Sequence, residues 1–234
     1  MRARIVRSLE ALPHPQGATL LDVGCWDGST TVRYASTVQA VRLLGVEVFE
    51  AQAQAAESRG VEVAHIDLEH GRFPWADASV DFVVCNQVLE HLKNVWLPLA
   101  EMHRALKPGG HAVLSVPNLA SLHNRVLLAF GRQPTSIRTF GPHVRGYTFR
   151  EFVGVVTYGD AFRIVRREGV GFPPLAPPWS APFSKLFPGA AHTAIVVAQR
   201  TAAAGSWRAW LERQRIEGVQ TLFEARRGAD DSSS

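Results

Sequence analysis

The feature that most constrains the fold of this chain is an alternation of short apolar runs with helix-like segments between residues 18 and 116. The apolar runs have the length of β-strands, and the segments between them are rich in helix-forming residues. Strands that alternate with helices across short connections form right-handed crossovers, so the strands lie parallel and the helices cover both faces of the sheet. The sequence therefore predicts an α/β fold with a doubly wound, mostly parallel sheet.

Seven runs are predicted to be strands, and together they account for a seven-stranded sheet. These runs are residues 18–23, 41–48, 61–66, 80–86, 111–116, 161–169 and 191–199. Helices are predicted at residues 3–12, 29–38, 50–60, 96–110 and 148–159, with Ser29 as an N-cap and Pro108-Gly109-Gly110 as a helix stop. The run VDFVVCN is nearly all apolar, as a strand buried on both faces of a parallel sheet must be.

The chain is predicted to form one main domain with additions at both ends. An N-terminal helix occupies residues 1–17, the main domain 18–200, an amphipathic C-terminal helix 205–227 and a disordered tail 228–234. Within the main domain, residues 117–150 form an irregular insertion. The proline-rich segment 172–188 is predicted to be a rigid connector, with an apolar pocket wall or a membrane contact as alternatives.

Composition narrows the classes of partner. Lys and Arg number 25 against 21 Asp and Glu, a net charge of +4 that is too small to argue for nucleic acid. Two cysteines are too few for a disulfide framework, and no run approaches the roughly 20 apolar residues of a membrane span. No signal peptide is predicted, so the expected location is the cytoplasm, with peripheral membrane contact left open.

The stretch LLDVGCWDGST joins the first predicted strand to the next helix, where nucleotide-binding loops begin. In a dinucleotide-binding loop the middle glycine lets the pyrophosphate approach the backbone. Here Gly24 and Gly28 are kept, but Trp26 occupies the middle position. The loop therefore favours a ligand that has no phosphate, and S-adenosylmethionine is such a ligand.

Four motifs in series resemble a known family. These are LLDVGCWDGS, GVEVFEAQ, HIDLEHGRFPWADASVDFVVCNQVLEHL and LAEMHRALKPGGHAVLSVPN. They resemble class I S-adenosylmethionine-dependent methyltransferases over residues 19–118, in the small-molecule branch often called type 11, and more loosely the MetW-like proteins. The resemblance implies a Rossmann-like class I fold and S-adenosylmethionine as the cofactor.

The resemblance also implies which residues contact the cofactor. Glu47 would accept hydrogen bonds from the ribose hydroxyls, Asp67 would contact the adenine amino group, and Leu68 would pack near the ring. The backbone at Asn86 would face the methionine portion, and Asp22 would orient the loop or the cofactor's amino group. The loop itself contributes Gly24, Cys25, Trp26 and Gly28. Asp22 and Asp67 would each also suit a turn or a helix cap.

Two histidines are candidates for a general base, because an alcohol acceptor must lose a proton and histidine titrates near neutral pH. His91 in LEHL follows the fourth predicted strand, close to where the methyl group should lie. His143 in GPHVRGY is the second candidate, and for both a structural role remains an alternative. No metal site is expected.

The segment from residue 118 to 150 is the most individual part of the chain. It holds five arginines and no Asp or Glu. In the family, the segment after the fifth strand commonly forms part of a lid over the acceptor. Guanidinium groups bind carboxylates and phosphates bidentately, so Arg138 and Arg145 are candidates for binding an anionic acceptor. Solvated arginines on exposed turns are the alternative.

The favoured function is O-methylation of a small molecule, or of a glycan or lipid-linked intermediate, with anionic character. One alternative is a non-catalytic partner protein of the MetW type. Another is an NAD-dependent oxidoreductase, against which Trp26 and Asp67 argue. Nucleic acid is not an expected substrate because no binding module is found, and the oligomeric state is left open.

Overall fold

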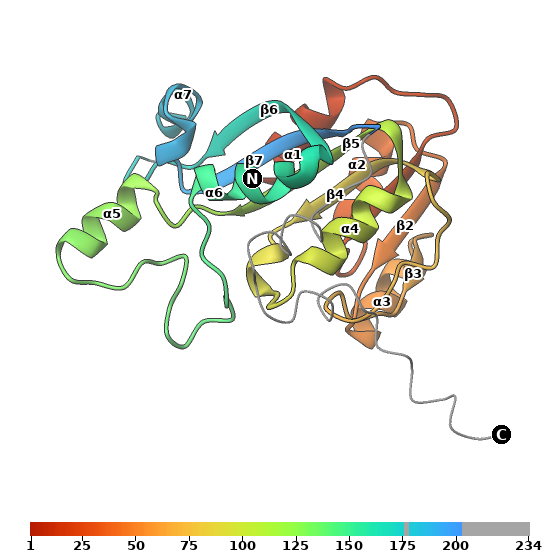
Figure 1. Cartoon of the computed structure of the whole chain (residues 1–234), viewed down its shortest axis with the longest axis horizontal. Helices are drawn as coiled ribbons and strands as arrows, with labels where there is room; N and C mark the ends of the chain where they lie inside the picture. Colours follow the sequence, from red (N-terminus) through yellow and green to blue (C-terminus); the bar gives the residue numbers. More distant parts are fainter. Residues whose placement is uncertain (176–177, 203–234) are drawn as a thin grey trace.

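The computed structural model describes residues 1–175 and 178–202, and within them the chain forms one seven-stranded sheet in the order β3-β2-β1-β4-β5-β7-β6 (Figure 1). The strands are β1 (Thr19–Val23), β2 (Arg42–Val46), β3 (Glu62–Ala64), β4 (Val80–Asn86), β5 (Leu106–Pro117), β6 (Phe162–Val170) and β7 (Thr193–Arg200). Neighbouring strands are parallel except where β7 pairs antiparallel with β5 and β6. The predicted doubly wound, mostly parallel fold is confirmed.

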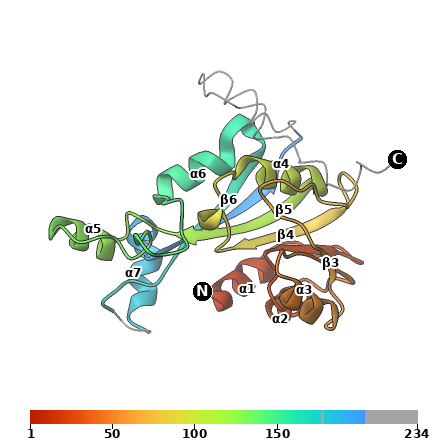
Figure 2. The ribbon, with the colours of Figure 1, turned by 90° about the horizontal axis from the view of Figure 1, so that it is seen from below.

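Helices cover both faces of this sheet (Figure 2). One face carries α4 (Trp96–Ala105) and α6 (Phe149–Thr157), and the other carries α1 (Arg2–Glu10), α2 (Ser29–Thr37) and α3 (Glu50–Glu57). Two further helices, α5 (Leu122–Ala129) and α7 (Ser180–Leu186), lie beyond one end of the sheet. Short 3-10 turns are η1 (Leu89–His91), η2 (Tyr158–Asp160) and η3 (Pro188–Ala190).

The core consists of two main apolar clusters, one against each face of the sheet. On the face of α4 and α6, Leu99, Met102 and Phe152 are fully buried against the strands. On the face of α1 and α2, Ile5 and Tyr34 are buried against the strands. Burial of both faces explains why β4 is apolar at nearly every position, as predicted.

The strand order reverses between β1 and β4. The chain first builds outward from β1 through β2 to β3 and then returns to place β4 on the other side of β1. In open parallel sheets a crevice forms at such a reversal, outside the carboxyl ends of the strands. The loops that follow β1, β2 and β4 therefore meet at one place.

Two local predictions are wrong at element ends. Gly28, with φ of 74°, precedes α2, and Ser29 is the first helical residue, so Ser29 is not the N-cap. Its hydroxyl donates to Asp27 Oδ1 at 2.7 Å, because an aspartate one residue before the glycine can reach forward into the first turn. The helix predicted over 96–110 ends at Ala105, because Leu106 pairs with Val80 and begins β5.

The proline-rich segment contains α7, which packs beside β6, and ends where η3 begins. The rings of Phe172 and Phe183 lie 5.7 Å apart, and Ser180 and Ser184 are the buried residues of α7. These contacts agree with a rigid connector, while a role in acceptor binding stays a prediction. The predicted C-terminal helix 205–227 and tail 228–234 lie outside the described residues. Among the helices that the structure describes, none is long and apolar enough to cross a membrane.

Candidate active site

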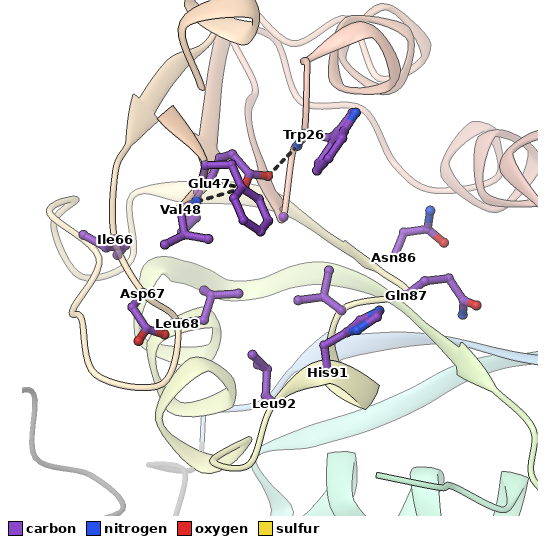
Figure 3. A pocket seen from close by; sticks show the side chains of 14 residues that line it. Trp26, Glu47, Val48, Ile66, Asp67, Leu68, Asn86, Gln87, His91 and Leu92 are labelled. Atoms are coloured by element: carbon purple, nitrogen blue, oxygen red, sulfur yellow. Dashed lines mark hydrogen bonds between the residues drawn. The ribbon is translucent and has the colours of Figure 1, made fainter. Parts of the chain in front are cut away.

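A cavity of about 420 Å³ opens where the loops after β1, β2 and β4 meet (Figure 3). Its walls include seven of the residues predicted from the sequence, namely Gly24, Trp26, Glu47, Asp67, Leu68, Asn86 and His91. The remaining lining residues are Val46, Val48, Phe49, Ile66, Gln87, Val88 and Leu92. The predicted nucleoside contacts and the predicted base therefore share one cavity.

Glu47, at the end of β2, is buried and holds the glycine loop in place. Its Oε2 accepts the backbone N–H of Trp26 at 3.0 Å, and its Oε1 accepts those of Val48 and Phe49 at 2.9 and 3.0 Å (Figure 3). An ionised carboxylate offers about four lone-pair positions, so these three bonds leave one, on Oε2, for a ligand. Glu47 can thus bind one ribose hydroxyl directly while it fixes the loop.

Gly24 and Gly28 have positive φ angles of 76° and 74° and lie in close packing. A Cβ on Gly24 would lie 2.6 Å from Cγ2 of Val88, in the loop after β4. A Cβ on Gly28 would lie 2.8 Å from Cα of Ala56 in α3. Both glycines are therefore required by conformation and by space.

Trp26 lines the outer part of the cavity. Its φ is 50°, its side chain is 54% exposed, and its ring meets Phe49 edge to face at 6.0 Å. The two rings form one wall at the cavity mouth. Cys25 points away from the cavity and packs against Gly45, and burial raises the pKa of its thiol to about 12, so it is a packing residue.

Asp22 lies behind the loop and outside the cavity. It is buried on β1, and its Oδ2 accepts the hydroxyl hydrogen of Thr31 in α2 at 2.7 Å. Burial raises the pKa of Asp22 to about 7, and the charge of nearby Glu47 acts in the same direction. The contact with Thr31 supports a role in orienting the loop.

Asp67 and Leu68 lie at the opposite wall from the loop. Asp67 Oδ1 accepts the backbone N–H of Glu69 at 2.9 Å, and its Oδ2 lies 2.8 Å from His70 Nδ1. These contacts shape the turn after β3, which was the alternative reading of this acid. Leu68 and Ile66 add an apolar surface on which a flat ring could lie (Figure 3).

The structure brings the two predicted histidines together, although 52 positions separate them. The rings of His91 and His143 lie 4.7 Å apart at an angle of 76°. His91 Nδ1 donates to the carbonyl of Pro142 at 3.3 Å, and His143 Nδ1 donates to that of Ser136 at 2.8 Å. Partial burial, with His143 nearby, lowers the pKa of His91.

Glu90 precedes His91 in LEHL, a motif expected near the methyl group, but no role is predicted for it from the sequence. Its side chain is only 1% exposed, and among the described residues neither carboxylate oxygen has a hydrogen-bond partner. Burial raises the pKa of Glu90 to about 7. The only signal in the sequence was an acid placed directly beside His91 in LEHL.

The two predicted acceptor-binding arginines lie in different places. The guanidinium of Arg145 donates to the carbonyls of Leu92 and Lys93, so it secures the loop that carries His91. Arg138 lines a second cavity of about 600 Å³. The other residues of that second cavity are His123, Leu127, Arg132, Gln133 and Thr135. Binding of an acceptor by either arginine stays a prediction.

The sequence of this chain is similar to those of known methyltransferases. Residues 21–114 match the family described as "Methyltransferase domain". The chain is 34% identical over 113 residues to the bifunctional methionine biosynthesis protein MetXA/MetW of Rhodopirellula baltica, covering 45% of this chain and 18% of that protein. It is 33% identical over 122 residues to the 27-O-demethylrifamycin SV methyltransferase of Amycolatopsis mediterranei, covering 47% and 44%. The chain thus spans less than half the length of these two relatives.

A solved structure with the same fold is an S-adenosylmethionine dependent methyltransferase from Mesorhizobium loti. It aligns with a TM-score of 0.59 and 21% identity, over 84% of this chain and 96% of that chain. Fold, cavity and matched region together define the class I S-adenosylmethionine-dependent methyltransferases. Residues 21–114 match the methyltransferase domain of this class, and S-adenosylmethionine is the cofactor of the class.

Proposed function

We propose that this protein is an S-adenosylmethionine-dependent methyltransferase that methylates an oxygen atom of a small molecule, or of a glycan or lipid-linked intermediate, with anionic character. The observation that carries the proposal is the single cavity that joins Glu47 and Leu68 at one end to His91 at the other. A cofactor whose nucleoside lies at the first end would present its methyl group near the second.

The residues fit the demands of the reaction. S-adenosylmethionine supplies a methyl group on a sulfonium that is already an activated leaving group, so positioning provides much of the catalysis. Glu47 and the glycine loop hold the nucleoside end, and Trp26 with Phe49 forms one wall beside it. The lowered pKa of His91 keeps its ring neutral near pH 7, so it can take the proton of an acceptor hydroxyl.

Anionic character of the acceptor is supported by the second cavity. Arg132, Arg138 and His123 line it together, and the segment from residue 118 to 150 contains no acidic residue. Guanidinium groups in such a setting bind carboxylates or phosphates.

Exposed apolar side chains at the end of the sheet where α5 and α7 lie favour a lipid-linked acceptor. They are concentrated on α5 and α7 and include Leu122, Val126, Leu128, Phe130, Trp179, Leu186 and Phe187. Apolar groups beside basic ones suit a surface that contacts anionic lipid. Flotation with phosphatidylglycerol vesicles should retain the wild type and release a Phe130→Ser, Leu128→Ser variant, and equal retention of both would contradict this part.

A second candidate function is that of a partner protein that keeps the fold while regulating another enzyme. The similarity to a MetXA/MetW protein favours it, because that relative joins two activities in one chain. A screen with S-adenosylmethionine carrying a labelled methyl group separates the two: transfer to any acceptor favours the methyltransferase.

Calorimetric titration of the full chain tests cofactor choice directly. Saturable 1:1 binding of S-adenosylmethionine and S-adenosylhomocysteine is expected, with no heat from NAD. Binding of NAD alone would overturn the proposal and favour an oxidoreductase.

A further inference from the structure

Three side chains with metal-binding chemistry converge beside the cavity. One carboxylate oxygen of Glu90 and one ring nitrogen each of His91 and His143 lie within 4.8 Å of one another. They come from two distant segments, since Glu90 and His91 belong to η1 after β4 and His143 belongs to the loop before α6. The tertiary fold, rather than a sequence motif, assembles this group.

The hydrogen bonds of the two histidines fix their orientation. A backbone carbonyl can only accept, so Nδ1 of His91 and of His143 must carry the hydrogen that each donates to Pro142 and Ser136. When His91 and His143 are neutral, the Nε2 atom of each ring therefore has the lone pair that can bind a metal ion. Metal-binding histidines show this arrangement, because a carbonyl behind one ring nitrogen orients the other toward the ion.

Glu90 supplies the second, independent observation. Its side chain is almost completely buried, and both of its oxygens lack a hydrogen-bond partner within the described part of the chain. Buried carboxylates are ordinarily paired or bound to a metal, because an uncompensated polar group costs free energy. The buried Glu90 carboxylate beside two imidazoles therefore has the surroundings of a metal ligand.

We propose that Glu90, His91 and His143 bind one divalent transition-metal ion, of which Zn²⁺ is the representative. Two imidazoles and a carboxylate suit Zn²⁺ and related ions, whereas Mg²⁺ and Ca²⁺ prefer oxygen ligands. Ligand atoms in a tetrahedral site lie roughly 3.3 Å apart, so the widest separation must close by about 1.5 Å, within reach of side-chain rotation. This inference differs from the sequence-based expectation of no metal.

The surrounding backbone already holds the two segments together. The N–H groups of Val144 and Arg145 donate to the carbonyl of Glu90 at 2.9 and 3.1 Å. Arg145 also binds the carbonyls of Leu92 and Lys93 through its side chain. The ligands thus sit on a clamped pair of loops, and such preorganisation favours a metal site.

The ion would retain open coordination positions, because the chain provides three ligands. Of the three ligands, His91 lines the cofactor cavity, so the ion would lie beside that cavity. With an ion bound, His91 would act as a ligand in place of its role as the base. The ion would lower the pKa of a coordinated acceptor hydroxyl, so that its proton passes to solvent and its oxygen can take the methyl group. This catalytic role, unlike the binding itself, rests on the proposed function.

Titration of the full chain with metal ions tests the binding in the absence of a methyl acceptor. The full chain without a histidine tag is stripped with chelator and titrated with Co²⁺, followed by visible absorption, and with Zn²⁺, followed by calorimetry. One equivalent should bind, with a Co²⁺ spectrum typical of nitrogen and oxygen ligands, and 5 mM Mg²⁺ should not compete. Zn²⁺ should also raise the melting temperature.

Substitutions of the proposed ligands test which residues bind the ion. His143→Asn and Glu90→Gln should each weaken Zn²⁺ binding by at least about tenfold and abolish the melting shift. His65→Ala is the matched control, because His65 contacts Glu50 and Glu57 at 3.0 Å in an exposed cluster of the same residue types. Its affinity for Zn²⁺ should equal that of the wild type.

Unchanged binding in Glu90→Gln and His143→Asn, or loss in His65→Ala instead, would overturn the proposal. So would the absence of saturable binding in the wild type. If Zn²⁺ binds but methyl transfer is indifferent to it, the site stands and its catalytic role fails, which separates this test from that of the proposed function.

Discussion

Two regions of the molecule hold their functional groups in different ways. We call the surroundings of the cavity at Glu47 the cofactor half, and residues 118–150 the lid half, after the role expected for that segment. In the first, Glu47 is buried and accepts three backbone N–H groups, and the glycines pack against neighbouring elements. In the second, Arg138 and the apolar side chains of α5 lie at the surface, without close packing around Gly131. A cofactor common to a whole class needs a fixed site, whereas an acceptor site must vary, so rigidity belongs to the first half.

The largest expected effect is a steric one in the cofactor half. Gly28→Ala should destabilise the fold by about 3 kcal/mol, because the left-handed backbone and the clash with Ala56 add together. Gly131 in the lid half has a similar φ of 66°, but in the described part of the chain no atom lies within 4 Å of the Cβ that Gly131→Ala would add. It should cost only about 1 kcal/mol. Urea unfolding compares the two, and equal losses would contradict the difference in packing.

The next effect is a pH dependence carried by Asp22. Its pKa is raised to about 7 in the folded state, so the folded chain retains a proton that the unfolded chain releases near pH 4. Stability from this group is therefore full below pH 4 and is lost progressively as the pH rises toward 7.

Asp22→Asn removes the titration and keeps an acceptor for Thr31. The free energy of unfolding should fall less between pH 5 and pH 8 in this variant than in the wild type. Parallel pH profiles for the two proteins would show that Asp22 does not carry the effect.

Glu47→Gln is expected to act on cofactor binding and modestly on stability. An amide offers one acceptor oxygen, so bonds to the loop are lost at about 1 to 2 kcal/mol. Affinity for S-adenosylhomocysteine should drop at least about tenfold, because loop and ribose contact depend on the same carboxylate. Glu57→Gln, on the exposed side of α3, is the control for calorimetry and should bind as the wild type does.

The smallest effect on stability is expected in the lid. Arg138→Ala should change the free energy of unfolding by less than about 0.5 kcal/mol, because the side chain lines an open surface cavity. The KM for an anionic acceptor found by labelled methyl transfer should rise several-fold, while Arg33→Ala on α2 leaves it unchanged. An unaltered KM in Arg138→Ala would favour the solvated-arginine alternative.

The contrast between the two halves also explains which features of the fold could be predicted from the sequence. The five parallel strands and the positions of Gly24, Glu47 and Asp67 could be predicted, because local periodicity and short motifs specify them. The end of α4 at Ala105 could not, because pairing of Leu106 with β4 outweighs the Pro-Gly-Gly stop signal. Helices α5 and α7 were missed in segments rich in turn-forming residues.

Within the site, sequence reasoning found His91 and His143 separately but not their contact. Their rings meet because the loop before α6 returns to η1, a tertiary event with no local signature. Burial of Glu90 was equally invisible, since an acid beside a histidine after a strand is ordinarily solvated. The separation of Arg138 from Arg145 also depends on how the lid folds.

The most direct test of the account is a crystal structure of the full chain with S-adenosylhomocysteine. The account predicts the ligand in the 420 Å³ cavity, with the ribose at Glu47, the adenine against Leu68 and the sulfur directed toward His91. A ligand bound elsewhere, or one whose sulfur points away from His91, would contradict the assignment of this cavity as the site of methyl transfer.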